Sequence, residues 1–221
     1  MQQIIDANPA EKLAEDLVAL LADRECVHIA VSGGSTPRQL FRTLAERYRD
    51  TAPWGCVTLW QVDERCVPPD DAQSNWRMLQ EELLSKIPAI RAHRMKAETL
   101  GGAEDYESLV RVHVASESTG GVPRLDIVLL GMGNDGHTAS LFPGTDALDE
   151  RKRLVVRNEV PQLGAPRVTM TFPLINAAAE RWFLVAGVDK AEAYARVMLG
   201  ELPASRIVEP RWYIDPVVLG P

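Results

Sequence analysis

Short apolar runs alternate along this chain with segments in which apolar residues recur every three or four positions. The runs at 26–31, 56–62 and 125–130 are largely apolar, a pattern typical of strands that are buried on both faces. Shorter runs of the same kind predict strands at 154–156, 168–171, 181–186 and 212–214.

Helical spacing predicts helices at 9–24, 36–48, 74–84, 102–114 and 189–199. Asn8, Thr36, Ser74 and Asp189 are the expected N-cap residues, and Pro37 suits the first helical position. Strands that alternate with helices predict one α/β domain over residues 1–221. We expect three layers, with a largely parallel sheet covered by helices on both faces.

Composition narrows the possible partners. The net charge is -7, with 46% hydrophobic and 25% charged residues, which argues against nucleic acid as the main partner. No apolar stretch is long enough to cross a bilayer and no secretion signal is evident, so a soluble, cytoplasmic protein is expected. The three cysteines form no C-x-x-C pair, which disfavours a disulfide framework or a zinc site.

The loop after the first strand has the composition of an anion site. Ser32, Gly33, Gly34, Ser35 and Thr36 lead from the strand into a helix. The glycines expose backbone N–H groups, and the helix dipole and the hydroxyls favour a phosphate. The alternative is a simple strand-to-helix turn with a good cap. The loop is not a P-loop, since the Gly-Lys-Ser/Thr ending of that motif is missing.

Charged residues follow the second strand. Asp63, Glu64 and Arg65 adjoin a run that is predicted to be buried, whereas a solvated loop would be the ordinary interpretation of such charges. Arg65 could bind a phosphate or carboxylate, and Asp63 could orient it or polarise a water molecule. Asn75 is also expected to face this crevice, since the carboxyl ends of parallel strands meet at one edge.

The loop after the third strand, at 131–144, matches G-x-G-x-x-G, but a dinucleotide site is rejected. Only six residues separate the last of these glycines from Pro143, too few for the long helix that such a site needs. Asp135 would also place a negative charge among the amides that bind pyrophosphate. We therefore predict no cofactor, and a loop that presents Asp135 and His137 for chemistry.

His137 is the candidate general base. Histidine titrates near neutrality, so it can accept a proton from water and return it, and Asp135 could fix its tautomer. His28 and His113 are interpreted as structural, and His93 is expected in a polar connector without a role.

Five segments together resemble the 6-phosphogluconolactonase family. They are Ser32-Gly-Gly-Ser-Thr-Pro37, Asp63-Glu-Arg-x-Val-Pro68 with Ser74-Asn75, Gly131-x-Gly-x-Asp-Gly-His-Thr-Ala-Ser-Leu-Phe-Pro143, Pro166-Arg-Val-Thr-Met-Thr171 and Gly187-Val-Asp-Lys190. The resemblance implies a Rossmann-like fold of the phosphosugar isomerase/lactonase type. It also implies that the loop at 32–36, Arg65, Arg167 and Lys190 bind the phosphate or the sugar.

The activity implied is that of a carboxylic-ester hydrolase in the oxidative pentose phosphate pathway. Its substrate would be 6-phospho-D-glucono-1,5-lactone, opened to 6-phosphogluconate with His137 as base, Asp135 and Asp63 in the catalytic set, and no metal or cofactor. The sequence leaves the oligomeric state open, and a monomer is compatible with it.

Two alternatives remain. Glucosamine-6-phosphate deaminases share some motifs, but they typically carry G-H-I-A-F-N-E-P where this chain has Gly136-His-Thr-Ala-Ser-Leu-Phe-Pro143. The acid of that segment takes part in the deaminase reaction and is absent here. The second alternative is a non-catalytic sugar-phosphate sensor that has kept the pocket.

Overall fold

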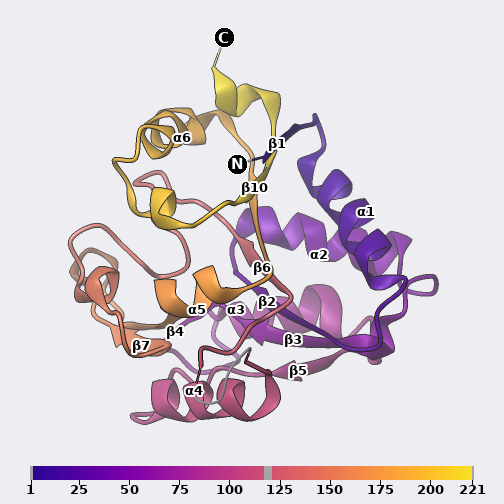
Figure 1. The fold of residues 1–221 in the computed structure, drawn as a ribbon, viewed down its shortest axis with the longest axis horizontal. Helices are drawn as coiled ribbons and strands as arrows, with labels where there is room; N and C mark the ends of the chain where they lie inside the picture. The colour runs from indigo at the N-terminus through magenta and orange to yellow at the C-terminus, as the bar shows by residue number, and fades with distance from the viewer. Residues whose placement is uncertain (1, 117–120, 221) are drawn as a thin grey trace.

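The computed structural model describes residues 2–116 and 121–220, which form a seven-stranded sheet flanked by helices (Figure 1). The strand order is β1-β10-β9-β6-β2-β3-β5, and every neighbouring pair is parallel. The strands are β1 (Gln2–Ile5), β2 (Val27–Val31), β3 (Val57–Gln61), β5 (Arg91–His93), β6 (Ile127–Leu130), β9 (Glu180–Val185) and β10 (Arg211–Ile214).

Helices cover both faces of this sheet, as the sequence predicted. The first three helices share one apolar core and the last three share the other. They are α1 (Pro9–Leu21), α2 (Ser35–Arg47), α3 (Asn75–Leu79), α4 (Gly102–His113), α5 (Phe172–Ala177) and α6 (Ala191–Met198). A π-helical turn over Gln80–Leu84 prolongs α3. No helix in the described part of the chain is long and apolar enough to cross a membrane.

The connectivity reverses at the centre of the sheet, between β2 and β6. From β2 the chain proceeds outward to β3 and β5, whereas from β6 it proceeds outward in the other direction to β9 and β10. Such a reversal leaves a crevice at the carboxyl ends of the two central strands. The loops that follow β2 and β6 are the two glycine-rich segments singled out in the sequence.

A second, three-stranded sheet was not predicted. It has the order β4-β8-β7, is antiparallel, and consists of β4 (Asp63–Arg65), β8 (Arg167–Met170) and β7 (Val155–Asn158). The charged segment after β3 is therefore a strand rather than a loop, because β8 supplies its hydrogen-bond partners. β1 and β5 were also missed, since they are short and largely polar and have no apolar run to mark them.

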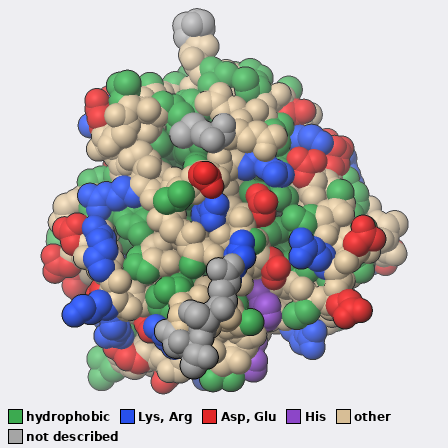
Figure 2. Space-filling view, viewed as in Figure 1, with side chains coloured by type: hydrophobic (Ala, Val, Ile, Leu, Met, Phe, Trp, Pro, Cys, Tyr) green, Lys and Arg blue, Asp and Glu red, His purple; other side chains and the backbone are tan. Residues whose placement is uncertain are grey.

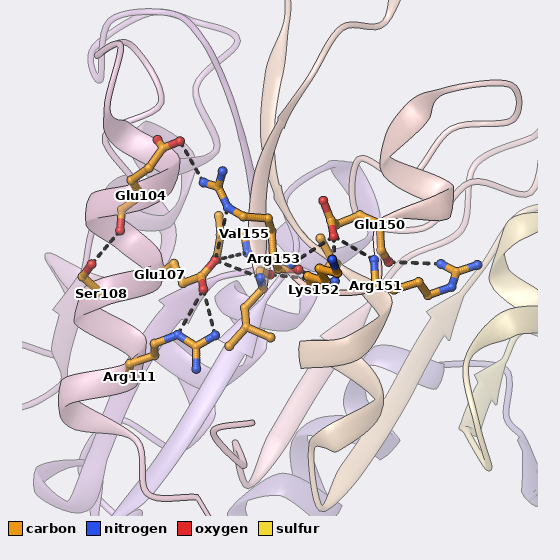
Figure 3. A network of polar contacts seen from close by, with 11 residues as sticks. Glu104, Glu107, Ser108, Arg111, Glu150, Arg151, Lys152, Arg153 and Val155 are labelled. Atoms are coloured by element: carbon orange, nitrogen blue, oxygen red, sulfur yellow. Dashed lines mark hydrogen bonds and ion pairs between the residues drawn. The ribbon is translucent and has the colours of Figure 1, made fainter. Parts of the chain in front are cut away.

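A partly buried carboxylate joins helix α4 to the second sheet. Glu107 of α4 accepts hydrogen bonds from the backbone N–H groups of Leu154 at 2.8 Å and Val155 at 3.2 Å, at the start of β7 (Figure 3). Its other oxygen accepts from the Arg111 guanidinium at 2.9–3.0 Å. Glu107 thus joins the start of β7 directly to α4.

Two predicted helix starts were wrong. α2 begins at Ser35 with Gly34 as the N-cap residue, so Thr36 lies inside the first turn. Gly34 has φ +115°, a conformation that glycine adopts without strain, and this lets the helix start earlier than a Thr36 cap would. Asp189 lies in a 3-10 turn, and Lys190 is the residue before α6.

His93 also has a different position from the one predicted. It lies in β5 and stacks on the buried ring of Trp60, with ring centroids 4.3 Å apart. Trp60 Nε1 donates to Nδ1 of His28 at 3.1 Å, and the ring of His113 lies 4.8 Å from that of His93. The three histidines are therefore neighbours that pack around one tryptophan.

Candidate active site

A cavity of about 480 Å³ opens at the carboxyl edge of the sheet, where the connectivity reverses. All twelve residues predicted for the site border it: Ser32, Gly33, Gly34, Ser35, Thr36, Asp63, Arg65, Asn75, Asp135, His137, Arg167 and Lys190. This volume is in the range of small-molecule sites. The structure thus brings the predicted residues together, while their chemical roles stay predictions.

His137 is held by Asp135 from the same loop. The Nδ1 atom of His137 lies 2.5 Å from Oδ1 of Asp135, and the backbone N–H of His137 donates to the same oxygen at 3.1 Å. An ionised carboxylate only accepts hydrogen bonds, so in the neutral imidazole Nδ1 carries the proton and Nε2 keeps its lone pair. His137 is therefore oriented as a proton acceptor.

The loop needs glycine at position 133 for this arrangement. A Cβ atom there would lie 2.1 Å from Nδ1 of His137 and 2.7 Å from Oδ1 of Asp135. The backbone also closes on itself, since the N–H of Gly133 donates to the carbonyl oxygen of His137 at 2.9 Å. The glycine recognised in the sequence therefore makes room for the imidazole.

Opposing effects act on the carboxyl group of Asp135. Partial burial raises its pKa, but hydrogen bonds and the charge of His137 lower it by more, so the pKa is below its usual value. Asp135 is consequently ionised at neutral pH and able to stabilise an imidazolium.

β4 separates its three charged residues onto two faces. Side chains alternate along a strand, so Asp63 and Arg65 face the cavity while Glu64 points the other way. Glu64 is 3% exposed and accepts five hydrogen bonds of 2.7–3.2 Å, which come from Gln61 Nε2, Ser74 Oγ and the backbone N–H groups of Arg65, Asn75 and Trp76. Glu64 thereby joins β4 to the start of α3.

Asp63 is buried at the cavity wall and held by its neighbours. Its Oδ2 accepts a hydrogen bond of 2.6 Å from Ser140 Oγ, and its carbonyl oxygen accepts one of 3.0 Å from Nδ2 of Asn75. Asn75 packs so closely on Gly33 that a Cβ there would lie 1.9 Å from the Asn75 amide oxygen. The three loops are thus joined by direct contacts.

Two cations face each other across β4 and β8. Arg65 and Arg167 are directly opposite in the antiparallel register, an arrangement that is unfavourable for like charges unless an anion lies between them. Burial and the charge of Arg65 lower the pKa of Arg167, while Asp63 opposes the shift. The Nε and Nη1 atoms of Arg167 are buried without a hydrogen-bond partner among the described residues.

The loop after β2 offers further donors to the cavity. The first N–H groups of α2 have no acceptor within the helix, and no side chain caps them. The hydroxyl of Ser32 is buried and has no partner in the part of the chain that the structure describes. On the far rim, Lys190 donates to the side-chain oxygen of Asn134 and lies 3.4 Å from Asp189 Oδ2.

Sequence reasoning missed Ser140, which binds Asp63, and Phe142, whose ring stacks on His137 at 4.0 Å. Both lie in the quoted segment Gly131–Pro143, but no residue pattern there identified their partners, which come from the fold. Within residues 2–116 and 121–220 no cluster of three or more His, Cys, Asp or Glu side chains is arranged for a metal ion.

Comparison with known proteins assigns the chain to a family. The model of the family described as glucosamine-6-phosphate isomerases/6-phosphogluconolactonase matches residues 2–214. The chain belongs to this family. Within the family, a 6-phosphogluconolactonase of Nostoc sp. is 38% identical over 200 residues, covering 85% of this chain and 81% of that protein.

Solved structures of family members show the same fold. The crystal structure of 6-phosphogluconolactonase from Leishmania guyanensis aligns with a TM-score of 0.86 and 28% identity, over 99% of this chain and 97% of that one. A monomeric glucosamine-6-phosphate deaminase aligns with a TM-score of 0.83 at 20% identity, over 99% of each chain. Lactonases and deaminases of the family therefore share one architecture, and side chains must distinguish them.

Proposed function

We propose that this chain hydrolyses 6-phospho-D-glucono-1,5-lactone to 6-phosphogluconate. The observation that carries the proposal is that a carboxylate-held imidazole and a pair of facing arginines border the same cavity of about 480 Å³. One end of such a site suits a phosphate, and the other suits an acyl carbon and a water molecule. The relatives named above support the proposal.

The phosphate is held at the arginine pair. Arg167 presents buried N–H groups without partners, and Arg65 lies opposite to it, so a dianion would relieve the repulsion between the two guanidinium groups. The free amides at the start of α2, the Ser32 hydroxyl and Lys190 supply further donors around the same cavity. Fixing the phosphate also fixes the distance from the lactone carbonyl to His137.

His137 activates the water. Its Nε2 takes a proton as the water oxygen attacks the carbonyl carbon, and Asp135 stabilises the imidazolium that forms. Backbone amides of the glycine loops stabilise the oxyanion. The bond between the carbonyl carbon and the ring oxygen then breaks, and His137 returns its proton to that oxygen. Asp63 is assigned to orienting Arg65 or polarising the water from the cavity wall.

A lactonase assay tests the proposal directly. Freshly made lactone is followed at controlled pH, with the spontaneous hydrolysis subtracted. The wild-type chain should hydrolyse the lactone, and His137→Ala should lower kcat by about 10²–10⁴ with little change in substrate affinity. The exposed His113 provides the matched control, because His113→Ala removes an imidazole outside the cavity.

The outcomes separate the alternatives. Near-normal turnover in His137→Ala would contradict the assignment of His137 as the general base. Release of ammonia from glucosamine 6-phosphate would support a deaminase, and binding of 6-phosphogluconate without hydrolysis of lactone would support a sensor. Arg167→Ala should mainly raise KM, and an unchanged KM would contradict its role.

The proposal also covers the domain that carries the activity, its location and its partners. We assign the activity to one α/β domain formed by residues 1–221, acting in the cytoplasm on a small phosphosugar lactone. Acidic and basic side chains are interspersed on the face drawn in Figure 2, which is consistent with a chain that has no nucleic-acid partner.

A further inference from the structure

One aromatic ring touches both ends of the candidate site. The ring of Phe142 stacks on the imidazole of His137, with centroids 4.0 Å apart and planes inclined by 28°. The guanidinium carbon of Arg167 lies 5.6 Å from the centroid of the same ring. Phe142 is 5% exposed, so its position is fixed by packing.

Neither of these polar groups is fully positioned by hydrogen bonds. The imidazole of His137 is bound at Nδ1, which leaves the ring free to tilt about that bond. Arg167 has two buried nitrogen atoms that find no partner among the residues described, so its direction also depends on the surfaces that it touches. Phe142 is a rigid, flat surface that both groups contact.

The apolar character of Phe142 matters as much as its shape. A carboxylate at this position would lie within reach of a guanidinium and an imidazole, and it would pair with them. That pairing would occupy the donors that an anionic ligand needs. A phenyl ring instead attracts a cation weakly, through its face, and leaves the N–H groups available.

We propose that Phe142 is a positioning residue that holds His137 and Arg167 in a fixed relation and adds no further carboxylate beside Asp135 and Asp63. The proposal rests on the function proposed above, because it assumes that the two groups act on one substrate.

Phe142→Leu removes the flat surface while keeping an apolar side chain. We expect kcat to fall by about tenfold or more, because the base is misoriented, and KM to rise severalfold, because Arg167 loses its support. Phe172→Leu is the matched control: Phe172 is 6% exposed and has Arg206 at 5.8 Å from its ring centroid, but it does not border the cavity. That variant should lose thermal stability without a change in kcat or KM. Phe142→Tyr keeps the ring and should retain most of the wild-type activity.

A second pair of variants separates charge from size. Phe142→Glu and Phe142→Gln have nearly the same shape, and both place a polar group in an apolar environment. Binding of inorganic phosphate, measured by calorimetry, should be weakened by Glu at least tenfold more than by Gln. Equal affinities of the two variants would overturn the claim that a carboxylate competes at this site.

A spectroscopic measurement keeps the inference separate from the proposed function. The ¹H and ¹⁵N ring shifts of His137 should be those of a single ring orientation in the wild-type chain, whereas Phe142→Leu should broaden or double them, because the ring can then tilt about its bond to Asp135. If the wild-type chain hydrolyses no lactone, the proposed function fails, yet the shifts and the phosphate binding still test the positioning. Unchanged shifts together with unchanged kcat and KM in Phe142→Leu would overturn the inference.

Discussion

Replacing Glu64 with glutamine should destabilise the protein far more than the loss of one charge suggests. The five groups that contact its carboxylate are all hydrogen-bond donors. Glutamine has one oxygen and one NH₂ group. Its NH₂ group would therefore face groups that also donate hydrogen bonds. If the NH₂ group takes the place of Oε1, the backbone N–H groups of Arg65 and Asn75 lose their acceptor. If it takes the place of Oε2, the backbone N–H of Trp76 and Nε2 of Gln61 lose theirs.

The magnitude follows from this count. In either orientation at least two buried donors lose their acceptor, and each such loss costs about 1–3 kcal/mol. The free energy of unfolding should therefore fall by roughly 2–6 kcal/mol, a large part of the 5–15 kcal/mol that is typical of a folded protein. Turnover should fall as well, because Glu64 joins the strand that carries Asp63 to the helix that carries Asn75.

Urea unfolding followed by circular dichroism measures the effect. The matched control is Glu81→Gln, since Glu81 lies on the neighbouring helical turn, is half-exposed and pairs with Arg77 at 2.8 Å. That variant should stay within about 0.5 kcal/mol of the wild type. If the free energy of unfolding of Glu64→Gln also stayed within 1 kcal/mol of the wild type, with the same slope against urea concentration, the Glu64 carboxylate would not accept these five hydrogen bonds.

Two further predictions concern the loop at 131–137 and the histidines around Trp60. Gly133→Ala should lower kcat by roughly 10² or more, because the new methyl group occupies the place of the His137 imidazole. Burial lowers the pKa of His28 and of His93 below the usual 6.5. The unfolded chain then binds more protons than the folded one below that pH, so stability should fall as the pH drops from about 6.5 through the folded pKa values.

Each of these predictions has a matched comparison. Gly131→Ala changes the same loop where a Cβ meets no atom within 4 Å, and it should keep kcat near the wild-type value; equal losses in both variants would contradict the steric argument. For the pH effect, His93→Phe keeps the stack on Trp60 and removes one titrating group. The urea midpoint of this variant should then change less between pH 7.5 and 5 than that of the wild type. The same change with pH in both proteins would contradict the contribution assigned to His93.

The sequence by itself determined the central strands of the main sheet and the residues of the site. Largely apolar runs marked the central strands β2, β3 and β6, because strands buried on both faces carry few polar residues. All twelve predicted site residues border one cavity, since unusual residues at the ends of parallel strands are brought to one edge. The order of the strands in the sheet, however, is not encoded in any local pattern.

Only the tertiary structure decided which side chains act on one another. β4 was predicted as a loop, because its residues are charged and its hydrogen-bond partners lie about a hundred positions away in β8. For the same reason the separate roles of Asp63 and Glu64 depend on a strand alternation that the sequence did not reveal. The contacts of Ser140 with Asp63, and of Phe142 with His137 and Arg167, combine segments that the chain brings together only by folding. Local patterns specify what a residue can do, and long-range packing specifies its partners.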